Sequence, residues 1–345
     1  MVSLDKGVGF VRLIQLFLFV IFFLFLREAS GQTSPGNLVE EAKKEGKVTF
    51  YTTTNVSESK PLLDGFRSRY PFIDPELNRA GGTSLLNRIV NEAKGGKHSM
   101  DVIAARPEFI TPLKNAGLLA KYDSPERRYY PDNLKDKEGY WTAYFLNLNT
   151  PGYNTRLVSG NELPRTYEEM LHPRWKGKLS MDTEDFEWFR TLLKLKGKEK
   201  GMKFFHALKE QEPIFRRGHA LQVQLMAAGE FPLVVNLYAH RIETHKQDHA
   251  PVEWYPIEPV ATLIFVVMVS GKAPHPASGR LLTDYILSRD GQEFIRKSHR
   301  VPARDGIDPD PPRLKKGLKW YVADPEEGGD YAETVSLSRK TFGLR

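Results

Sequence analysis

Hydrophobic and polar positions alternate between the periods of strands and helices along residues 47–117. β-Branched and aromatic residues over 47–54 predict a strand, and apolar positions at helical spacing over 57–71 predict a helix that stops at Pro71. The pattern then predicts a strand over 72–79, a helix over 84–96 with Ser84 as N-cap, a strand over 101–105 and a helix over 107–117. Such a succession is typical of a parallel, doubly wound sheet.

The same succession returns in the second half of the chain. We expect a strand over 177–181, a helix from about Thr183, a helix over 219–230, a strand over 231–238 and a further helical stretch. Residues 252–271 cross back through a proline-marked kink, and residues 278–298 predict one amphipathic helix. Beyond about Pro302, the proline, glycine and charge content predicts a loosely ordered tail on the surface.

The N-terminus carries a separate signal. Basic residues precede an apolar run from Leu13 to Leu26, and small residues follow at the spacing that a signal peptidase reads. This pattern predicts a secretory signal peptide over 1–31, cleaved before Gln32, and a linker over 32–36. The run is shorter than the roughly 20 residues of a transmembrane helix. An uncleaved membrane anchor is the competing interpretation, and both place most of the chain outside the cytoplasm.

Composition narrows the function further. The chain has 345 residues, 40% of them hydrophobic, and can bury the cores of two lobes. Its net charge of +7 is not gathered into a basic run, which disfavours nucleic acid as a partner. It has no cysteine, which excludes disulfides, thiolate zinc sites and cysteine nucleophiles. No motif for a serine nucleophile, a phosphate-binding loop or a catalytic zinc is present.

Three loops follow predicted strands, over 52–55, 80–84 and 181–185. Each offers hydroxyls and the free N–H groups of a helix start, which bind small anions. A single such loop is usually an ordinary N-cap, but three in corresponding positions favour a site. Arg106 ends the strand over 101–105, either as an anion clamp or as an exposed strand-edge arginine. The loop candidates are Thr53, Thr54, Gly82, Thr83, Ser84, Thr183 and Asp185.

The stretch from Asn236 to His249 is rich in metal-ligating side chains. Phenolate, imidazole and carboxylate groups are ligands of transition metals. Neighbouring imidazoles on an exposed helix are nevertheless more often bystanders. We therefore predict that Tyr238 and Asn236 belong to a ligand cleft, and that His240, His245 and His249 mostly do not.

The order of these segments resembles that of the periplasmic solute-binding proteins of bacterial ABC importers, type 2 class, and among them the ferric-iron-binding subgroup. The likeness covers about residues 36–305 and includes "EEAKKEGKVTFYTTT", "DVIAARPEFITPLKNAGLLAKYDSP" and "AAGEFPLVVNLYAH". It implies an α/β fold of two lobes, each a doubly wound sheet flanked by helices, joined by two crossing strands near Phe145–Asn149 and Pro256–Ala261. Lobe 1 would comprise 37–145 plus 261–320, lobe 2 would comprise 146–260, and 321–345 would form a surface tail.

The resemblance also bears on metal binding. In the ferric-binding subgroup, two adjacent tyrosines ligate iron, and here they match Tyr238 and Ala239. The subgroup's histidine ligand falls near Asn55 and its carboxylate ligand near Arg106. Three of the four expected ligands are replaced, so Tyr238 is a weak metal candidate and no other metal ligand or cofactor is predicted.

The expected function is that of an extracytoplasmic, periplasmic substrate-binding component of an ABC transporter. It would act as a non-enzymatic monomer that closes by a hinge on a small anion and docks on a membrane permease. The anion would be a carboxylate, phosphonate, sulfonate or metal chelate. Alternatives are a ferric-iron transport protein using Tyr238, an enzyme of cofactor-precursor synthesis on the same fold, and a membrane-tethered sensor. The predicted ligand-binding residues are Thr53, Thr54, Gly82, Thr83, Ser84, Arg106, Thr183, Asp185, Asn236 and Tyr238.

Overall fold

The computed structural model describes residues 35–323 and 331–344. Residues 39–345 form one compact unit, to which the sheet and the core belong. The predicted signal peptide lies outside the described residues, as does most of the predicted linker. Within the described ranges, no helix is both long and apolar enough to span a membrane.

Twelve strands of the described chain hydrogen-bond into one sheet, in the order β2-β1-β3-β10-β5-β8-β6-β7, with β4 and β12 on β10 and with β9 and β11 on β5. The strands are β1 (Lys47–Thr52), β2 (Asp74–Arg79), β3 (Val102–Ala105), β4 (Leu119–Ala120), β5 (Thr142–Asn154), β6 (Leu179–Asp182), β7 (Ile214–Arg216), β8 (Leu233–Tyr238), β9 (Val252–Trp254), β10 (Val260–Ser270), β11 (Val301–Pro302) and β12 (Trp320–Val322). The predicted strands near 47–54, 72–79, 101–105, 177–181 and 231–238 are confirmed.

Two corrections concern the sheet. Its outer strands β1, β2 and β3 are parallel, as are β6, β7 and β8, but β10 runs antiparallel to β3 and β5 runs antiparallel to β8. The sheet is therefore mixed, not purely parallel. We also expected a separate sheet in each lobe, whereas β5 and β10 pair with each other and make the hydrogen-bonded path continuous.

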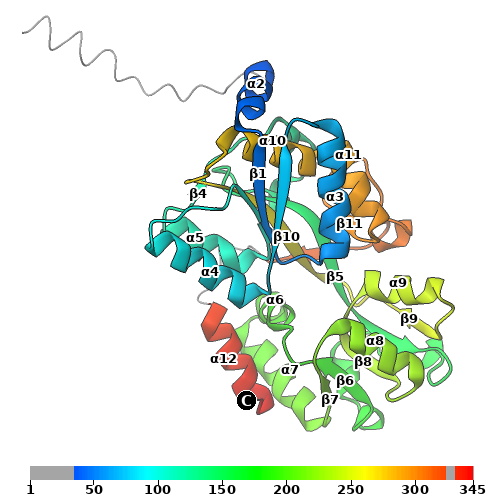
Figure 1. Ribbon diagram of the computed structural model, residues 1–345. Helices are drawn as coiled ribbons and strands as arrows, with labels where there is room; N and C mark the ends of the chain where they lie inside the picture. Colours follow the sequence, from blue (N-terminus) through cyan, green and yellow to red (C-terminus); the bar gives the residue numbers. More distant parts are fainter. Residues whose placement is uncertain (1–34, 324–330, 345) are drawn as a thin grey trace, which may run out of the picture. The chain divides into compact units, whose positions relative to one another are not determined.

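The long strands β5 and β10 form the centre of the sheet (Figure 1). All but one residue of each is buried; this explains the nearly continuous hydrophobic sequence of β10, whereas β5 also buries polar residues such as Asn147 and Asn149. Phe145–Asn149, the first predicted crossing, pairs with Ala261–Phe265. The second predicted crossing, Pro256–Ala261, lies mostly before β10 begins. The lobe boundaries drawn at these crossings stay a prediction.

Helices flank the sheet. The α-helices are α2 (Pro35–Glu45), α3 (Val56–Arg69), α4 (Gly82–Lys94), α5 (Ile110–Asn115), α6 (Phe186–Lys196), α7 (Lys198–Glu210), α8 (His219–Ala228), α9 (Ala239–Gln247), α10 (Pro276–Leu287), α11 (Arg289–Lys297) and α12 (Tyr331–Phe342). The 3-10 helices are η1 (Pro107–Phe109), η2 (Pro125–Tyr129), η3 (Asp132–Leu134), η4 (Gly160–Glu162), η5 (Glu168–Leu171), η6 (Pro173–Trp175) and η7 (Pro312–Leu314).

Three helix boundaries differ from the prediction. Helix α4 begins at Gly82 with Gly81 as N-cap, so Ser84 lies inside its first turn. Helix α6 begins only after Asp185, which is its N-cap. The single helix predicted over 278–298 is two helices, because Ser288 has extended backbone angles (φ −67°, ψ 168°) and its hydroxyl caps α11 by accepting from the N–H of Gly291 at 3.3 Å.

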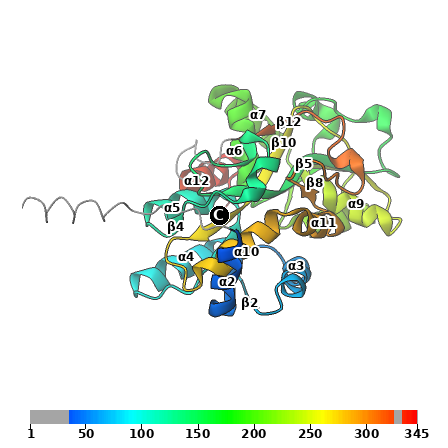
Figure 2. The same ribbon diagram turned by 90° about the horizontal axis from the view of Figure 1, so that it is seen from above.

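The C-terminal region is not the loosely ordered surface tail that we expected. Strand β12 pairs with β10, and α12 lies beside α6 and α7 in both views (Figures 1 and 2). Phe342 is buried, with its ring centroid 5.9 Å from that of Phe205. The rest of the buried face of α12 consists of Thr334, Ser338 and Thr341. Since hydroxyl residues do not register as a hydrophobic stripe, the sequence pattern did not reveal this packing.

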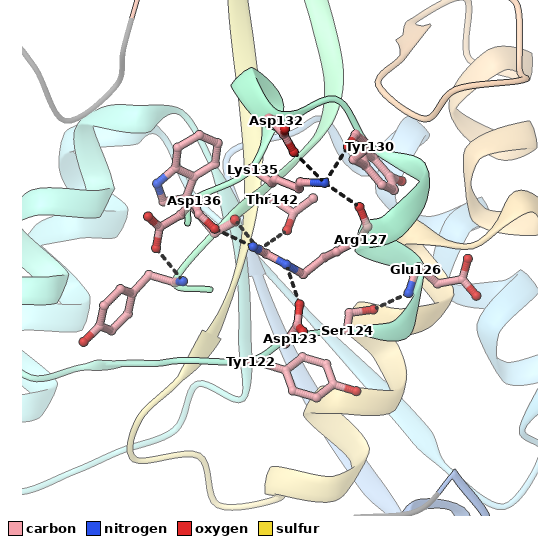
Figure 3. Close-up of polar contacts among 12 residues, drawn as sticks. Tyr122, Asp123, Ser124, Glu126, Arg127, Tyr130, Asp132, Lys135, Asp136 and Thr142 are labelled. Atoms are coloured by element: carbon pink, nitrogen blue, oxygen red, sulfur yellow. Dashed lines mark hydrogen bonds and ion pairs between the residues drawn. The ribbon is translucent and has the colours of Figure 1, made fainter. Parts of the chain in front are cut away.

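An arginine fixes the segment that leads into β5. The guanidinium of Arg127 donates to the backbone oxygens of Trp141 (2.9 Å) and Asp136, to Thr142 Oγ1 (2.9 Å) and to Asp123 Oδ1 (3.0 Å). The residues around it also hydrogen-bond to one another (Figure 3). These four hydrogen bonds of Arg127, hereafter the Arg127 cluster, attach η2 and its flanking loop to the first residue of β5.

Candidate functional site

A buried polar group lies where β6 and β8 end and α6 begins. Asp185 Oδ2 accepts a short hydrogen bond from Asn149 Nδ2 and a longer one from Asn236 Nδ2 at 3.3 Å. Asn236 in turn accepts from the backbone N–H of Asp182 at 3.0 Å. Burial, opposed by nearby His219, raises the pKa of Asp185 to about 6. The structure thus brings two predicted residues, Asp185 and Asn236, into one hydrogen-bonded group.

Tyr238 lies beside this group, against two histidines. Its ring centroid is 3.9 Å from that of His219 and 5.7 Å from that of His240. His219 Nε2 is 3.6 Å from Asp185 Oδ2. Burial and the charge of Asp185 hold the pKa of Tyr238 well above its usual value, and burial holds the pKa of His240 well below. The phenol and the His240 imidazole are therefore neutral near pH 7.

The three histidines of the 236–249 stretch have different environments. His240 is buried, not on an exposed face as expected. His245 Nδ1 lies 3.0 Å from the backbone oxygen of Arg241. His249 follows the end of α9 and has a positive φ of 58°, so it does not share a helical face with His245.

An ion pair that the sequence did not suggest connects His240 to the first turn of α3. Arg300 donates to Glu58 Oε2 and to Asn147 Oδ1, each at 2.9 Å, and its Nη1 is 2.9 Å from His240 Nε2. Thr54 lines the same small pocket as Glu58 and Arg300, and its hydroxyl is 2.9 Å from the hydroxyl of Tyr144. Thr53 donates its N–H to the Ala104 oxygen at 3.3 Å, and its buried hydroxyl has no partner.

A larger cavity, of about 600 Å³, lies at the start of α4. Helix α4 has no side-chain N-cap and no acidic residue in its first turn. A Cβ atom on Gly82 would lie only 3.0 Å from Arg106 Nη2, so the guanidinium reaches the first turn of the helix. The lining residues are Gly82, Thr83, Leu86, Arg106, Pro107, Glu108, Phe109, Thr111, Pro112, Asn115, Glu187, Arg190, Tyr331 and Ala332.

Four charged residues of this lining, Arg106, Glu108, Glu187 and Arg190, form what we call the charged quartet. Arg106 Nε is 2.8 Å from Glu108 Oε1, and Arg190 Nη2 is 2.9 Å from Glu187 Oε2. The Glu108 and Glu187 side chains are each only 6% exposed. Glu108 Oε2 and Arg190 Nε are buried and have no hydrogen-bond partner among the residues that the structure describes. Burial raises the pKa of Glu108; the cation of Arg106 opposes this rise and the anion of Glu187 adds to it.

Sequence reasoning found only part of this arrangement. Gly82, Thr83 and Arg106 line the cavity, whereas Ser84 is exposed and is not in its lining. Thr183 is half-buried and donates its N–H to the Arg216 oxygen at 3.2 Å. Six residues of these sites were not predicted from the sequence: Glu108, Glu187, Arg190, Tyr331, His219 and Arg300. Of these, only Glu187 and Arg190 left a signal, as charges among the aromatic and apolar residues of the first turns of α6. That all ten predicted residues touch one ligand stays a prediction.

The donor set for iron is sparse. Within residues 35–323 and 331–344, no group of three or more histidine, aspartate and glutamate side chains is arranged to hold a metal ion. Ala239, next to Tyr238, has no donor atom. Ferric iron prefers several hard anionic ligands, and the neutral phenol of Tyr238 must lose its proton before it can serve as one.

Comparison with known proteins agrees with this fold. The chain is 21% identical over 278 residues to the Fe(3+)-binding periplasmic protein of Serratia marcescens, covering 78% of this chain and 81% of that protein. Iron-bound HitA from Pseudomonas aeruginosa superposes with a TM-score of 0.77 at 20% identity, covering 86% of this chain and 99% of HitA. The periplasmic binding protein AfuA from Actinobacillus pleuropneumoniae, with exogenous fructose-6-phosphate bound, gives 0.73 at 19% identity, covering 87% and 100%.

These likenesses confirm the predicted two-lobed fold of type 2 periplasmic binding proteins. A family model described as bacterial extracellular solute-binding protein matches residues 97–334, well over half of the chain. This chain therefore belongs to the family of bacterial extracellular solute-binding proteins.

Proposed function

We propose that this protein is the periplasmic substrate-binding component of an ABC importer, which captures a small organic anion and delivers it to a membrane permease. Family membership supports the transport role. The observation that carries the choice of an anion is the position of Arg106 beside the uncapped start of α4, in a cavity of about 600 Å³.

The chemistry of that corner suits an oxyanion. The first N–H groups of a helix lack intrahelical acceptors, and the helix dipole adds a partial positive charge. Arginine offers parallel donors that match a carboxylate, phosphonate or sulfonate. Because Gly82 has no side chain, an anion can approach the Gly82 and Thr83 amides and the Arg106 guanidinium together. Leu86, Phe109 and Pro112 in the lining would contact the carbon skeleton of the ligand.

Ferric iron is the second candidate, favoured by one observation. Tyr238 lies against His219, whose Nε2 is 3.6 Å from Asp185, so three donor types of a hard-metal site are neighbours. The raised pKa of Tyr238 opposes this candidate at neutral pH.

Calorimetry of the purified chain separates the two candidates. The probes are organic carboxylates, phosphonates and sulfonates, together with ferric citrate and ferric nitrilotriacetate. We expect an organic anion to bind without being consumed. Arg106→Ala should weaken that binding at least about tenfold, Arg106→Lys less, and Tyr238→Phe little.

Three outcomes would contradict this proposal. Binding of iron alone that is lost in Tyr238→Phe would establish the iron alternative. If Arg106→Ala leaves the affinity for every anion unchanged, the anion does not bind at the start of α4. Turnover of a bound compound would make the protein an enzyme.

A further inference from the structure

The cavity at α4 contains two carboxylates as well as two guanidinium groups. Arg106 and Glu108 come from β3–η1, and Glu187 and Arg190 come from α6. The charges cancel as two ion pairs, Arg106–Glu108 at 2.8 Å and Glu187–Arg190 at 2.9 Å. A site for a simple anion needs the guanidinium groups but gains nothing from two buried carboxylates, which repel that anion.

The Glu108 carboxylate is incompletely paired. Its side chain is 6% exposed, and within residues 35–323 and 331–344 only Oε1 has an ion-pair partner, while the buried Oε2 has no hydrogen-bond partner. Buried carboxylate oxygens without donors are rare because their lost hydration is not replaced. Glu108 Oε2 could therefore accept one more hydrogen bond than the protein supplies.

Anion binding increases this deficit. Arg106 is the only cation that pairs with Glu108 in the described residues. An anion that takes the Arg106 guanidinium weakens this pair and leaves the charge of the Glu108 carboxylate less compensated, in the field of Glu187. Removing one partner from a buried ion pair is strongly unfavourable unless another donor replaces it. A ligand that carries its own cationic donor replaces it directly.

We propose that Glu108 and Glu187 form a second subsite for an ammonium group, so that the preferred ligand is a small zwitterion. Its anionic end lies on Arg106 and the α4 amides, and its ammonium pairs with the Glu108 carboxylate once that side chain turns its buried Oε2 toward the cavity. This assignment rests on the proposed function for the anionic end and adds the class of the ligand. A hydroxyl at the same place donates one hydrogen bond but does not compensate the charge, and binds more weakly.

Matched ligand pairs test the ammonium subsite in the wild-type protein. The pairs are β-alanine with propionate, taurine with ethanesulfonate, and 3-aminopropylphosphonate with propylphosphonate. Glycine, 4-aminobutyrate and 3-hydroxypropionate vary the spacing and the donor. For the head group that binds best, we expect the amino member to bind at least tenfold more tightly than the plain anion, and the hydroxyl analogue to lie between them.

Variants assign the preference to Glu108. Glu108→Gln should reduce the amino-to-plain ratio to within about threefold of unity and leave the plain anion at least as tightly bound. Glu187→Gln should reduce the ratio less, because in the wild type the Glu187 carboxylate is already paired with Arg190 and has less need of the ligand's ammonium. Glu243→Gln is the matched control, since Glu243 is buried and paired with Arg313 outside the cavity lining, and it should leave the ratio unchanged.

The possible failures are distinct. Amino and plain members that bind equally and depend on Arg106 would overturn the zwitterion proposal and leave the anion site standing. If no member of any pair binds, both proposals are rejected. A wild-type preference that survives in Glu108→Gln and Glu187→Gln alike would place the ammonium elsewhere. Since the ligand pairs are compared first in the wild type, the result does not depend on a variant that fails to fold.

Discussion

The Arg127 cluster and the charged quartet are both built around buried arginines, but they differ in hydrogen bonding. Every side-chain nitrogen of Arg127 has an acceptor, and most of these acceptors are backbone or hydroxyl oxygens (Figure 3). In the quartet, Glu108 Oε2 and Arg190 Nε have no hydrogen-bond partner in the described part of the chain, and both residues line a cavity. Side-chain exposure is 8% for Arg127, 12% for Arg190 and 29% for Arg106, so Arg190 is buried to a comparable extent and Arg106 less.

The difference teaches which buried charge serves the fold and which serves a ligand. The hydrogen bonds of a fully paired arginine compensate for its lost hydration and order the chain around it. A partly paired group keeps hydrogen-bonding capacity that a ligand can complete, as is common at binding sites. The comparison predicts that Arg127 affects stability and not specificity, whereas the quartet affects specificity and has a smaller, pH-dependent effect on stability.

The largest expected effect is on the Arg127 cluster. Arg127→Met keeps the bulk of the side chain but removes the donors to the Trp141 and Asp136 oxygens. We expect the free energy of unfolding to fall by about 3 kcal/mol, since buried acceptors lose their partners. Ligand preference in the folded variant should be unchanged. Urea denaturation measures the loss, and a loss below about 1 kcal/mol would contradict a structural role for the cluster.

A smaller, pH-dependent effect is expected in the quartet. Burial raises the pKa of Glu108 above its ordinary value of 4.5, so the folded protein holds this proton more tightly than the unfolded chain. The stability from this group is full below about pH 4.5 and is lost as the pH rises through the raised pKa. Glu108→Gln imitates the protonated form. It should gain about 1 kcal/mol relative to wild type between pH 4.5 and pH 8.

Denaturation curves of both proteins at the two pH values give this double difference. The Glu243→Gln variant serves as the control for loss of a buried carboxylate elsewhere. If the stability difference between Glu108→Gln and wild type is the same at both pH values, or smaller at pH 8, then Arg106 fully compensates the buried charge of Glu108.

The smallest effect on stability is expected at Gly82. In Gly82→Ala the new Cβ atom would lie 3.0 Å from Arg106 Nη2, and the flexible end of that side chain can move away. The free energy of unfolding should change by less than about 0.5 kcal/mol, because the better helix propensity of alanine offsets the cost of moving Arg106. Affinity for the anion should nevertheless fall several-fold, since Arg106 and the helix amides no longer face the same point. Calorimetry with the best-binding anion detects this, and an unchanged affinity would separate Arg106 from the α4 site.

Much of the fold could be predicted from local pattern. Helix α3 carries a period-3.6 signal because it is buried on one face, whereas strands β1 and β3 are buried almost throughout and are recognised as short β-branched, aromatic or apolar runs. The break at Ser288 was missed because apolar positions continue in helical register through it. The packing of α12 was missed because hydroxyl residues make most of its buried face.

The site was less predictable than the fold. Gly82 and Arg106 could be proposed because they follow strands of a doubly wound region, where ligands bind. Glu108 became significant only when its distance to Arg106 and the absence of a second partner were known. Glu187, Arg190 and Tyr331 come from α6 and α12, and their meeting with Arg106 depends on long-range packing that no local pattern encodes.

Hydrogen–deuterium exchange with and without the best-binding organic anion tests the central claim most directly. If the ligand completes the charged quartet, amides of residues 82–86 and 106–109 should gain protection. Those of residues 124–142, around Arg127, should exchange as before. Protection confined to residues 183–188 and 236–241, with none at the start of α4, would contradict this account and assign the ligand to the Tyr238 group.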